Sequence, residues 1–351
     1  MKRYKEFQYG HQVKVVKEHP DWFNSDSLNG KFKGNYYEFV LQDGRNNLFS
    51  GIRSNDAEDH MNVLEYFRAN KIGWWSGDMP TGHLCSSQIS CVNHLYPLRY
   101  DEKAVLALAN AVAGEVFFDS VIEVGGDCKF PGYIAFEVVT NRDYLNESKN
   151  GKLSRGSQCT SVDAVILAKR HEKIWLLPIE WKFVERYERD DKSGISFDRK
   201  SGKWNLKGEE RIFRYFTKPE STLVPNSEQI IYDGKDPHGT VFFQEPYYQL
   251  MRQTLWAEQA IRNKDPFFEG AEDYFHVHVV PDADGDLLDN KYRNATWEHG
   301  LGMVNTWKSY LTQPKKYHCI NPKSLYSGIL SDEHLSNKYS RLIQYLEARY
   351  W

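Results

Sequence analysis

The sequence predicts a mixed α/β protein in which helices cover a central sheet, and two observations carry this prediction. First, three short segments rich in β-branched and aromatic residues follow one another between polar loops, which is typical of strands: 133–139, 161–167 and 174–184. Second, segments with helical signals lie before and after these strands, at 86–96, 101–112 and 246–262. A sheet covered by helices is an arrangement that buries the apolar faces of both.

The first two expected helices have recognisable starts. Ser86 or Ser87 can accept a hydrogen bond from an amide of the first turn, in a helix that ends before Pro97. Asp101 and Glu102 suit the positive end of the next helix. Both helices would therefore precede the predicted strands directly.

The remaining elements follow from similar signals. A helix is expected to begin at Pro246, because a first helical position does not need the N–H that proline lacks. We also expect a helix over 56–70 and a strand over 275–280. The C-terminal segment is predicted to be helical, because apolar residues recur there at helical spacing: Leu335, Tyr339, Leu342, Leu346 and Tyr350.

Composition excludes several classes of protein. The chain has 351 residues, of which 40% are hydrophobic and 26% charged, as in ordinary globular proteins. No apolar run approaches the roughly 18 residues of a membrane span, and the first residues lack the apolar core of a secretory signal. The five cysteines are scattered and contain no Cys-x-x-Cys pair, which favours reduced thiols in a cytoplasmic protein over a zinc site. A net charge of −3 excludes a wholly basic surface but not a local basic patch.

We expect three regions along the chain. Residues 1–80 pack on or form part of the core, residues 81–280 form the core, and residues 281–351 form a helical extension. A charged insertion interrupts the core at about 185–236. From Lys182 to Lys218 it contains eleven Lys and Arg against seven Asp and Glu, which fits either a solvated loop or an arm that follows phosphates.

Two carboxylates on neighbouring strands are the most informative feature. Alternation along the strand places Glu180 and Lys182 on one face, opposite an apolar face. Asp163 lies on the preceding strand, and the short connection favours an antiparallel hairpin. If Ala168 pairs with Lys173, Asp163 lies diagonal to Glu180; if the pairing shifts by two residues, the two face each other directly. In both registers the carboxylates lie about 5 to 8 Å apart.

Such a pair suits a hard divalent cation. Without a metal the carboxylates would repel each other, whereas Mg²⁺ or Mn²⁺ prefers oxygen ligands of this kind. The main-chain carbonyl of Trp181 could complete the coordination of a metal held by Asp163 and Glu180, and Lys182 could orient an attacking water. The alternative is a surface ion pair between Glu180 and Lys182, which the apolar flanks of the strand disfavour.

These residues resemble the PD-(D/E)XK nuclease superfamily, which has the restriction-endonuclease-like fold, and more narrowly an uncharacterised bacterial branch of it. Three stretches carry the narrower resemblance: 86–98, 160–164 with 179–182, and 246–252. The resemblance implies a restriction-endonuclease-like core, a central mixed sheet flanked by helices, with N- and C-terminal additions. It also implies metal held by Asp163 and Glu180 and catalysis aided by Lys182, with Val162 replacing the proline of the superfamily.

Further site residues are expected from the same resemblance. Many members of the superfamily add a carboxylate upstream, for which Glu137 is the first choice, with Glu147 and Glu115 behind it. A solvent-facing strand position is the alternative for Glu137. Gln249 and Arg252 lie on adjacent turns of one helix and could reach phosphate, or could form an ordinary polar helix face.

The function that we expect is Mg²⁺-dependent endonuclease activity, with Mn²⁺ as a substitute, leaving 5′-phosphate and 3′-hydroxyl ends. The expected partner is nucleic acid, DNA rather than RNA, and two chains could pair as a homodimer for double-strand cleavage. The alternative is an inactive nuclease-like fold that binds nucleic acid or a protein. A glycosidase with paired carboxylates ranks last, because it has no role for Lys182.

Two other features are ambiguous. His276 and His278 share a strand face, but no third metal ligand is evident, so strand packing is the preferred interpretation. The Trp-rich segment 73–77 could stack on a nucleic-acid base, although packing beneath a loop is the simpler interpretation.

Overall fold

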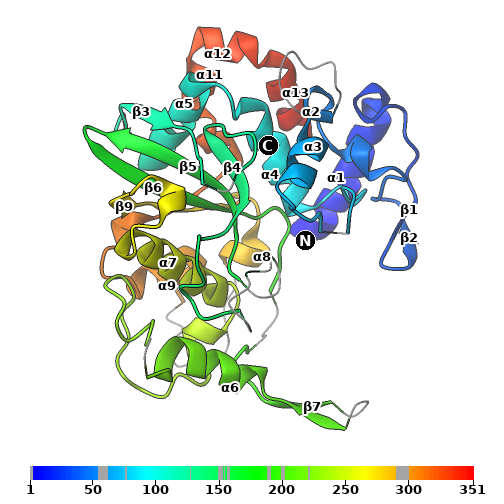
Figure 1. Cartoon of the computed structure of the whole chain (residues 1–351). Coiled ribbons are helices and arrows are strands. Elements are labelled where there is room, and N and C mark those ends of the chain that lie inside the picture. The colour runs from blue at the N-terminus through cyan, green and yellow to red at the C-terminus, as the bar shows by residue number, and fades with distance from the viewer. Residues whose placement is uncertain are drawn as a thin grey trace.

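A mixed sheet of seven strands, with helices on both faces, forms the centre of the molecule (Figure 1). The structure is a computed structural model, and it describes residues 3–53, 62–75, 77–126, 128–148, 153, 155, 159–187, 191–198, 202–219, 222–289 and 300–351. The predicted fold class, a mixed α/β protein with a central mixed sheet flanked by helices, is therefore confirmed. No disulfide joins any of the five cysteines, all of which are among the described residues.

The hairpin of β5 (Val162–Arg170) and β6 (Lys173–Trp181) is the middle of the sheet. The two strands are antiparallel, with Ala164 opposite Ile179 and Arg170 opposite Lys173. Of the two registers considered from the sequence, this is the one in which Asp163 and Glu180 face each other directly. Only His171 and Glu172 remain for the turn, and His171 has the left-handed backbone (φ 54°) that tight hairpin turns require.

Other strands extend the sheet on both sides of this hairpin. On one side, two strands pair antiparallel with successive parts of β5: β3 (Ser120–Ile122) and β4 (Ile134–Val138). On the other side, two strands run parallel to β6: β9 (Asp273–Tyr274) and β10 (His276–Val279). The edge strand β11 (Tyr317–Ile320) is parallel to β10, so the C-terminal region that we predicted to be helical also contributes a strand.

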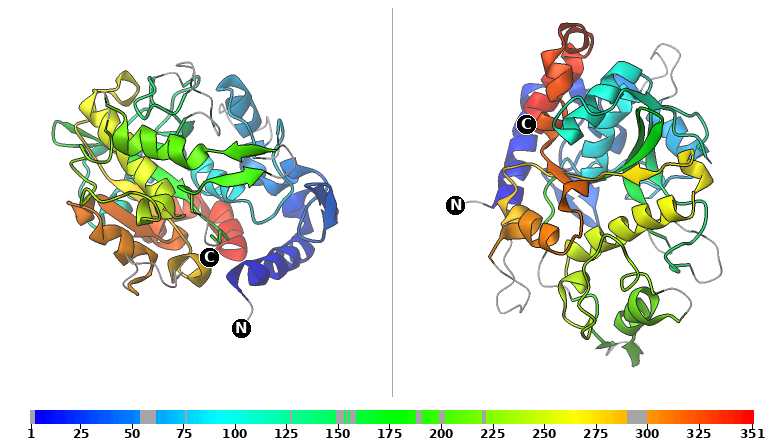
Figure 2. Two further views of the ribbon diagram at one scale, coloured as in Figure 1. Left: turned by 90° about the horizontal axis from the view of Figure 1, so that it is seen from below. Right: turned by 90° about the vertical axis from the view of Figure 1, so that its left-hand side faces the viewer.

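Helices cover each face of the sheet, as Figure 2 shows from two further directions. The first face packs against α4 (Ser87–Leu95) and α5 (Glu102–Ala113), which begin after Ser86 and Asp101 as predicted. The second face packs against α7 (Tyr247–Arg262), whose N-cap is Pro246. Side chains alternate along β6 accordingly, because Leu177, Ile179 and Trp181 enter the first core and Leu176 enters the second.

The N-terminal region lies beside the first face. It contains helices and one hairpin: α1 (Tyr4–Glu18), β1 (Gly30–Phe32), β2 (Asn35–Tyr37), α2 (Ser50–Arg53) and α3 (Val63–Ala69). Part of the helix predicted over 56–70 lies outside the described residues, and the described part contains α3. Single-turn 3₁₀ helices connect elements throughout: Pro20–Phe23, Gly44–Asn47, Tyr96–Leu98, Val241–Phe243, Pro266–Phe268 and Pro314–Lys316.

The C-terminal region is mostly short helices, which lie in both the upper and the lower part of the molecule in Figure 1. These helices are α8 (Gly285–Leu288), α9 (Gly302–Ser309), α10 (Pro322–Leu325), α11 (Ser327–Ser331), α12 (Glu333–Lys338) and α13 (Ser340–Arg349). The predicted apolar periodicity therefore spans two helices, with a break at Tyr339.

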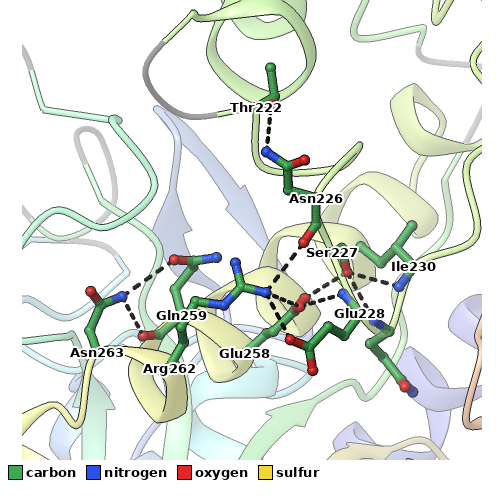
Figure 3. A network of polar contacts seen from close by, with 10 residues as sticks. Thr222, Asn226, Ser227, Glu228, Ile230, Glu258, Gln259, Arg262 and Asn263 are labelled. Atoms are coloured by element: carbon green, nitrogen blue, oxygen red, sulfur yellow. Dashed lines mark hydrogen bonds and ion pairs between the residues drawn. The ribbon is translucent and has the colours of Figure 1, made fainter.

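The charged insertion projects from the lower end of the molecule in Figure 1 and has structure of its own. Its described part contains β7 (Ser196–Asp198) paired with β8 (Lys203–Asn205), then α6 (Lys207–Ile212) and a π-helix (Phe213–Thr217). Where the insertion returns to the core, a polar network attaches it to α7 (Figure 3). The Glu258 carboxylate accepts hydrogen bonds of 2.6 Å from the Ser227 hydroxyl and the Glu228 amide, and Arg262 donates to the Asn226 carbonyl.

A buried arginine joins the two ends of the chain. The guanidinium of Arg349 is inaccessible to solvent and donates to the Gln12 side chain, to Asn47 and to the carbonyl of Leu84. It makes no ion pair with a carboxylate among the described residues, so hydrogen bonds alone compensate its burial. The C-terminal helix α13 is thereby attached to two segments of the N-terminal region and to the segment just before α4.

We predict that Arg349→Leu lowers the free energy of unfolding by about 3 kcal/mol, because several buried acceptors lose their donor. The exposed Arg341 on the same helix provides the control, since Arg341→Leu should change stability by less than about 0.5 kcal/mol. Urea unfolding followed by circular dichroism measures both. Equal stability of the two variants would contradict this role of Arg349.

Candidate active site

Three carboxylates lie side by side on three adjacent strands. The β5–β6 register places Asp163 opposite Glu180, and the β4–β5 register places Glu137 opposite Asp163 on the other side. Glu137 has a left-handed backbone (φ 50°), a conformation that is costly for a residue with a side chain. Backbone strain of this kind gathers at functional sites, and here it falls on the residue expected to be the additional carboxylate.

The three carboxylates affect one another electrostatically. Burial raises the pKa of Asp163 well above its usual value, and the neighbouring carboxylates of Glu180 and Glu137 raise it further. Burial likewise raises the pKa of Glu137, partly opposed by its hydrogen bond from Gln88. The Trp181 amide donates to Asp163 Oδ2 at 2.7 Å, which fixes one carboxylate oxygen against the neighbouring strand. A positive charge placed among these groups would relieve their repulsion.

Lys182 supplies one positive charge beside the carboxylates. Its ammonium lies 2.6 Å from Glu180 Oε1 and donates at 2.7 Å to the Gln249 side chain. Burial alone would lower the pKa of Lys182, but the Glu180 carboxylate and the other acidic groups around it together outweigh burial and raise the pKa, so the ammonium stays charged. The predicted Glu180–Lys182 pair is thus a buried ion pair rather than a surface one.

Helix α7 holds Glu180 through two amides one turn apart. Gln249 Nε2 donates to Glu180 Oε1 at 2.7 Å, and Gln253 Nε2 donates to Glu180 Oε2. Gln253 is oriented in turn by His276 Nε2, 3.1 Å from its side-chain oxygen, and the other ring nitrogen of His276 contacts the Thr254 hydroxyl. Burial lowers the pKa of His276 to about 3, so the ring is neutral near pH 7.

The two histidines of β10 therefore act in packing and orientation. His276 is part of the chain that leads through Gln253 to Glu180, whereas His278 contacts the Tyr317 hydroxyl at 2.9 Å. Both rings are buried in the sheet. One site residue that sequence reasoning missed is Gln253, although its spacing of four residues from Gln249 on one helix could have indicated a shared face.

The donor set of the site fits a hard cation that retains bound water. Within the described part of the chain, no three His, Cys, Asp or Glu side chains are placed so that they could together hold a metal ion. A cation at Asp163 and Glu180 would need main-chain oxygen and water as further ligands, a mixture that is common for Mg²⁺ and unsuitable for structural Zn²⁺. The Trp181 carbonyl stays the predicted main-chain ligand.

The carboxylates and Lys182 open into a cleft of about 820 Å³ between the sheet and the N-terminal region. Its floor contains Glu137, Asp163, Glu180, Trp181, Lys182 and Gln249. Gln88, in the first turn of α4, also lines the cleft and donates to Glu137 Oε1 at 2.9 Å. This residue belongs to one of the three stretches that carry the resemblance, but its role was not anticipated from the sequence.

Arg252 has a different environment from the other predicted residues. Its guanidinium lies 2.8 Å from Glu147 Oε1, and it is absent from the cleft lining. The buried Glu147 carboxylate also accepts from the hydroxyls of Thr160 and Tyr215. Glu147 is thus hydrogen-bonded to residues other than Asp163, and Glu115, which follows α5, is exposed. Glu137 is therefore the upstream carboxylate that lies beside Asp163 and Glu180. The substrate-binding role of Arg252 stays a prediction.

The arrangement of fold and cleft defines the class of the protein: a mixed sheet flanked by helices, as in restriction-endonuclease-like domains. More narrowly, the chain belongs to the family described as Restriction Endonuclease associating with ARP, whose model matches residues 17–351. This family indicates nuclease activity and interaction with DNA. No curated protein and no solved structure matches the chain significantly. Among the described residues, no helix is long and apolar enough to cross a membrane.

We predict that Arg252→Met lowers the free energy of unfolding by about 2 kcal/mol, because the 4%-exposed Glu147 side chain would lose its charge partner. Arg262→Met on the same helix is the matched control, because its guanidinium is 41% exposed and its ion pairs should contribute less than about 1 kcal/mol. Thermal and urea unfolding compare the two. A loss of oligonucleotide binding in Arg252→Met without a loss of stability would instead favour a phosphate contact.

Proposed function

We propose that the protein is a Mg²⁺-dependent endonuclease of the PD-(D/E)XK type that hydrolyses phosphodiester bonds of DNA. The observation that carries this proposal is the meeting of Asp163, Glu180 and Lys182 at the bottom of one cleft. Two carboxylates side by side with a charged lysine match the chemistry of metal-assisted hydrolysis, in which negative charge must be held and a water oriented.

In this proposal some residues hold the cation and others orient them. Asp163, Glu180 and the main-chain carbonyl of Trp181 would hold the cation, which when bound supplies Lewis-acid activation of phosphate and water. The Trp181 amide fixes the orientation of the Asp163 carboxylate, and the two glutamines of α7 fix that of Glu180. Orientation of this kind keeps the ligands in place before substrate arrives.

Lys182 is the residue expected to position the attacking water. An ammonium has three N–H donors, of which Glu180 and Gln249 take two, so one is left for a water molecule. The same charge would offset the negative charge that grows on the phosphate as the bond to the 3′ oxygen breaks. Attack in line with that oxygen leaves 5′-phosphate and 3′-hydroxyl ends.

A second candidate function is binding without cleavage, and one observation favours it. Both oxygens of the Glu180 carboxylate already accept hydrogen bonds, from Lys182, Gln249 and Gln253. A cation would have to share or displace these donors to reach Glu180. If they are not displaced, the domain would recognise DNA without hydrolysing it.

The nuclease proposal predicts metal-dependent nicking of supercoiled plasmid by the wild type. Lys182→Ala should reduce the rate by about 100-fold or more, because the water and the developing charge lose their donor. Lys173→Ala, at the exposed far end of the same strand, should cut like the wild type. Reactions with Mg²⁺, Mn²⁺ and EDTA identify the metal, and gel electrophoresis measures the products. Equal cutting by Lys182→Ala and the wild type would place the site elsewhere.

Metal binding can be tested without cleavage, through stability. Mg²⁺ should raise the melting temperature of the wild type, because a bound cation relieves the repulsion among the carboxylates. Asp163→Asn should melt about 1–3 °C higher than the wild type in EDTA and should lose the response to Mg²⁺. Glu172→Gln, in the exposed turn of the same hairpin, is the control and should keep the wild-type response. A Mg²⁺ response retained by Asp163→Asn would contradict the metal assignment.

A further inference from the structure

The wall of the cleft that faces the carboxylates is built from aromatic rings and cations of the N-terminal region. Phe32 and Lys33 come from the β1–β2 hairpin, and Trp75 and His83 come from the loops before α4. Lys33 and Gly34 form the turn of that hairpin, both with positive φ (48° and 90°), which lets the turn lie against Trp75. We call these four residues, Phe32, Lys33, Trp75 and His83, the aromatic wall.

The rings of the aromatic wall stand close together without forming a closed stack. The Phe32 ring centroid is 5.0 Å from that of Trp75 and 5.0 Å from that of His83. The Lys33 ammonium lies 5.3 Å from the Phe32 ring and 5.4 Å from the Trp75 ring. Such a cluster offers a π surface and a positive charge in one place, the combination that proteins use to hold bases and phosphates of unpaired strands.

Exposure distinguishes Trp75 from its neighbour. Trp74 is buried and stacks on Phe67 at 3.9 Å, so it fulfils the packing interpretation of this segment. Trp75 is 55% exposed and lines the cleft, so its ring is accessible to a bound group. Of the two interpretations of the Trp-rich segment, packing therefore describes Trp74, and base stacking is open only to Trp75.

A single amide connects the aromatic wall to the catalytic floor. Gln88 Oε1 accepts from the Trp75 amide at 2.9 Å, while Gln88 Nε2 donates to the Gly73 carbonyl and to Glu137. Gln88, in the first turn of α4, thus links the main chain at Trp75 to the Glu137 carboxylate. A group that rests on Trp75 would be held at a defined place relative to Asp163 and Glu180.

Cations accompany the carboxylates in this cleft. Its lining contains five cationic side chains, Lys5, Lys33, Arg155, Lys182 and Arg186, and four carboxylates, Glu137, Asp163, Glu180 and Glu185. Burial lowers the pKa of His83 to about 4, so this ring is neutral near pH 7 and adds stacking surface rather than charge. The cleft therefore offers cations for a sugar–phosphate backbone and rings for a base, around a floor that can bind a divalent cation.

We propose that the cleft binds an unpaired nucleotide of a DNA strand, with its base stacked on the aromatic wall and its phosphate directed to Asp163, Glu180 and Lys182. The placement of the phosphate rests on the proposed function, and the stacking of the base does not. A base inside a duplex is already stacked on a neighbouring base at each face, so it cannot also stack on Trp75. The volume of about 820 Å³ falls in the range of pockets that enclose one small molecule, and it suits a nucleotide extruded from a duplex or present in a single strand. Single-stranded segments, flaps and distorted sites are thus the substrate class.

The test measures binding of fluorescein-labelled dT12 by anisotropy in EDTA, so that no cleavage occurs. The wild type should bind dT12 more tightly than a 12-base-pair duplex. Trp75→Ala should weaken dT12 binding by about 5- to 100-fold, as expected for the loss of one base–aromatic stack. Trp75→Phe should restore most of the affinity, since a phenyl ring can still stack. Trp204→Ala, which removes a 65%-exposed tryptophan on β8 outside the cleft, should bind like the wild type.

Several outcomes overturn the proposal. It fails if Trp75→Ala and the wild type bind dT12 equally, or if Trp75→Ala weakens duplex binding as much as dT12 binding. It also fails if the Trp75→Phe and Trp75→Ala variants lose the same affinity while both melt like the wild type, because a ring at this position would then be irrelevant.

The failure of this proposal can be distinguished from failure of the nuclease proposal by one further variant. Trp75→Ala should weaken dT12 binding in the Lys182→Ala protein as it does in the wild type, because base stacking does not use the Lys182 ammonium, even though Lys182→Ala should nick plasmid only slowly. If Trp75→Ala loses binding while Lys182→Ala cleaves normally, the stacking site is correct and the catalytic assignment is wrong. If Lys182→Ala loses cleavage while Trp75→Ala keeps its full affinity for dT12, the catalytic assignment is correct and the stacking site is wrong.

Discussion

The pairing of Ala164 with Ile179 is the constraint on which the site depends. Because side chains alternate along a strand, a shift of one residue would send Asp163 to the opposite face and leave Glu180 alone. The two-residue turn at His171 and Glu172 and the apolar residues of both strands hold the register. Everything else in the cleft, from the amides of α7 to Gln88, is arranged around carboxylates whose positions this pairing sets.

Grouped carboxylates are costly for the folded protein, and the surrounding structure offsets part of that cost. The buried carboxylate of Glu180 and the half-buried carboxylates of Asp163 and Glu137 repel one another. Lys182 and the side-chain amides of Gln249, Gln253 and Gln88 compensate part of their charge. Such arrangements are common where stability is given up for function. The left-handed backbone of Glu137 also lowers stability at a position that lies in the candidate site.

How much could be read from the sequence depended on the range of the interactions. Strands β4 to β6 and helices α4, α5 and α7 follow from local periodicity and capping, and the meeting of Asp163, Glu180 and Lys182 follows from strand alternation. Contacts between residues far apart in the chain left no local signal. The Gln88–Glu137 bond, the engagement of Arg252 by Glu147 and the addition of β11 to the sheet are of this kind, since each depends on how distant segments come together.

The attachment of α13 to the N-terminal region has a consequence for synthesis on the ribosome. The strands that carry Asp163 and Glu180 emerge long before Arg349, whose hydrogen bonds join Gln12, Asn47 and Leu84 into one unit. That unit carries the wall which closes the cleft opposite the carboxylates. During synthesis, these three partners of Arg349 must therefore wait until β5 and β6 have been made before they gain the guanidinium that joins them.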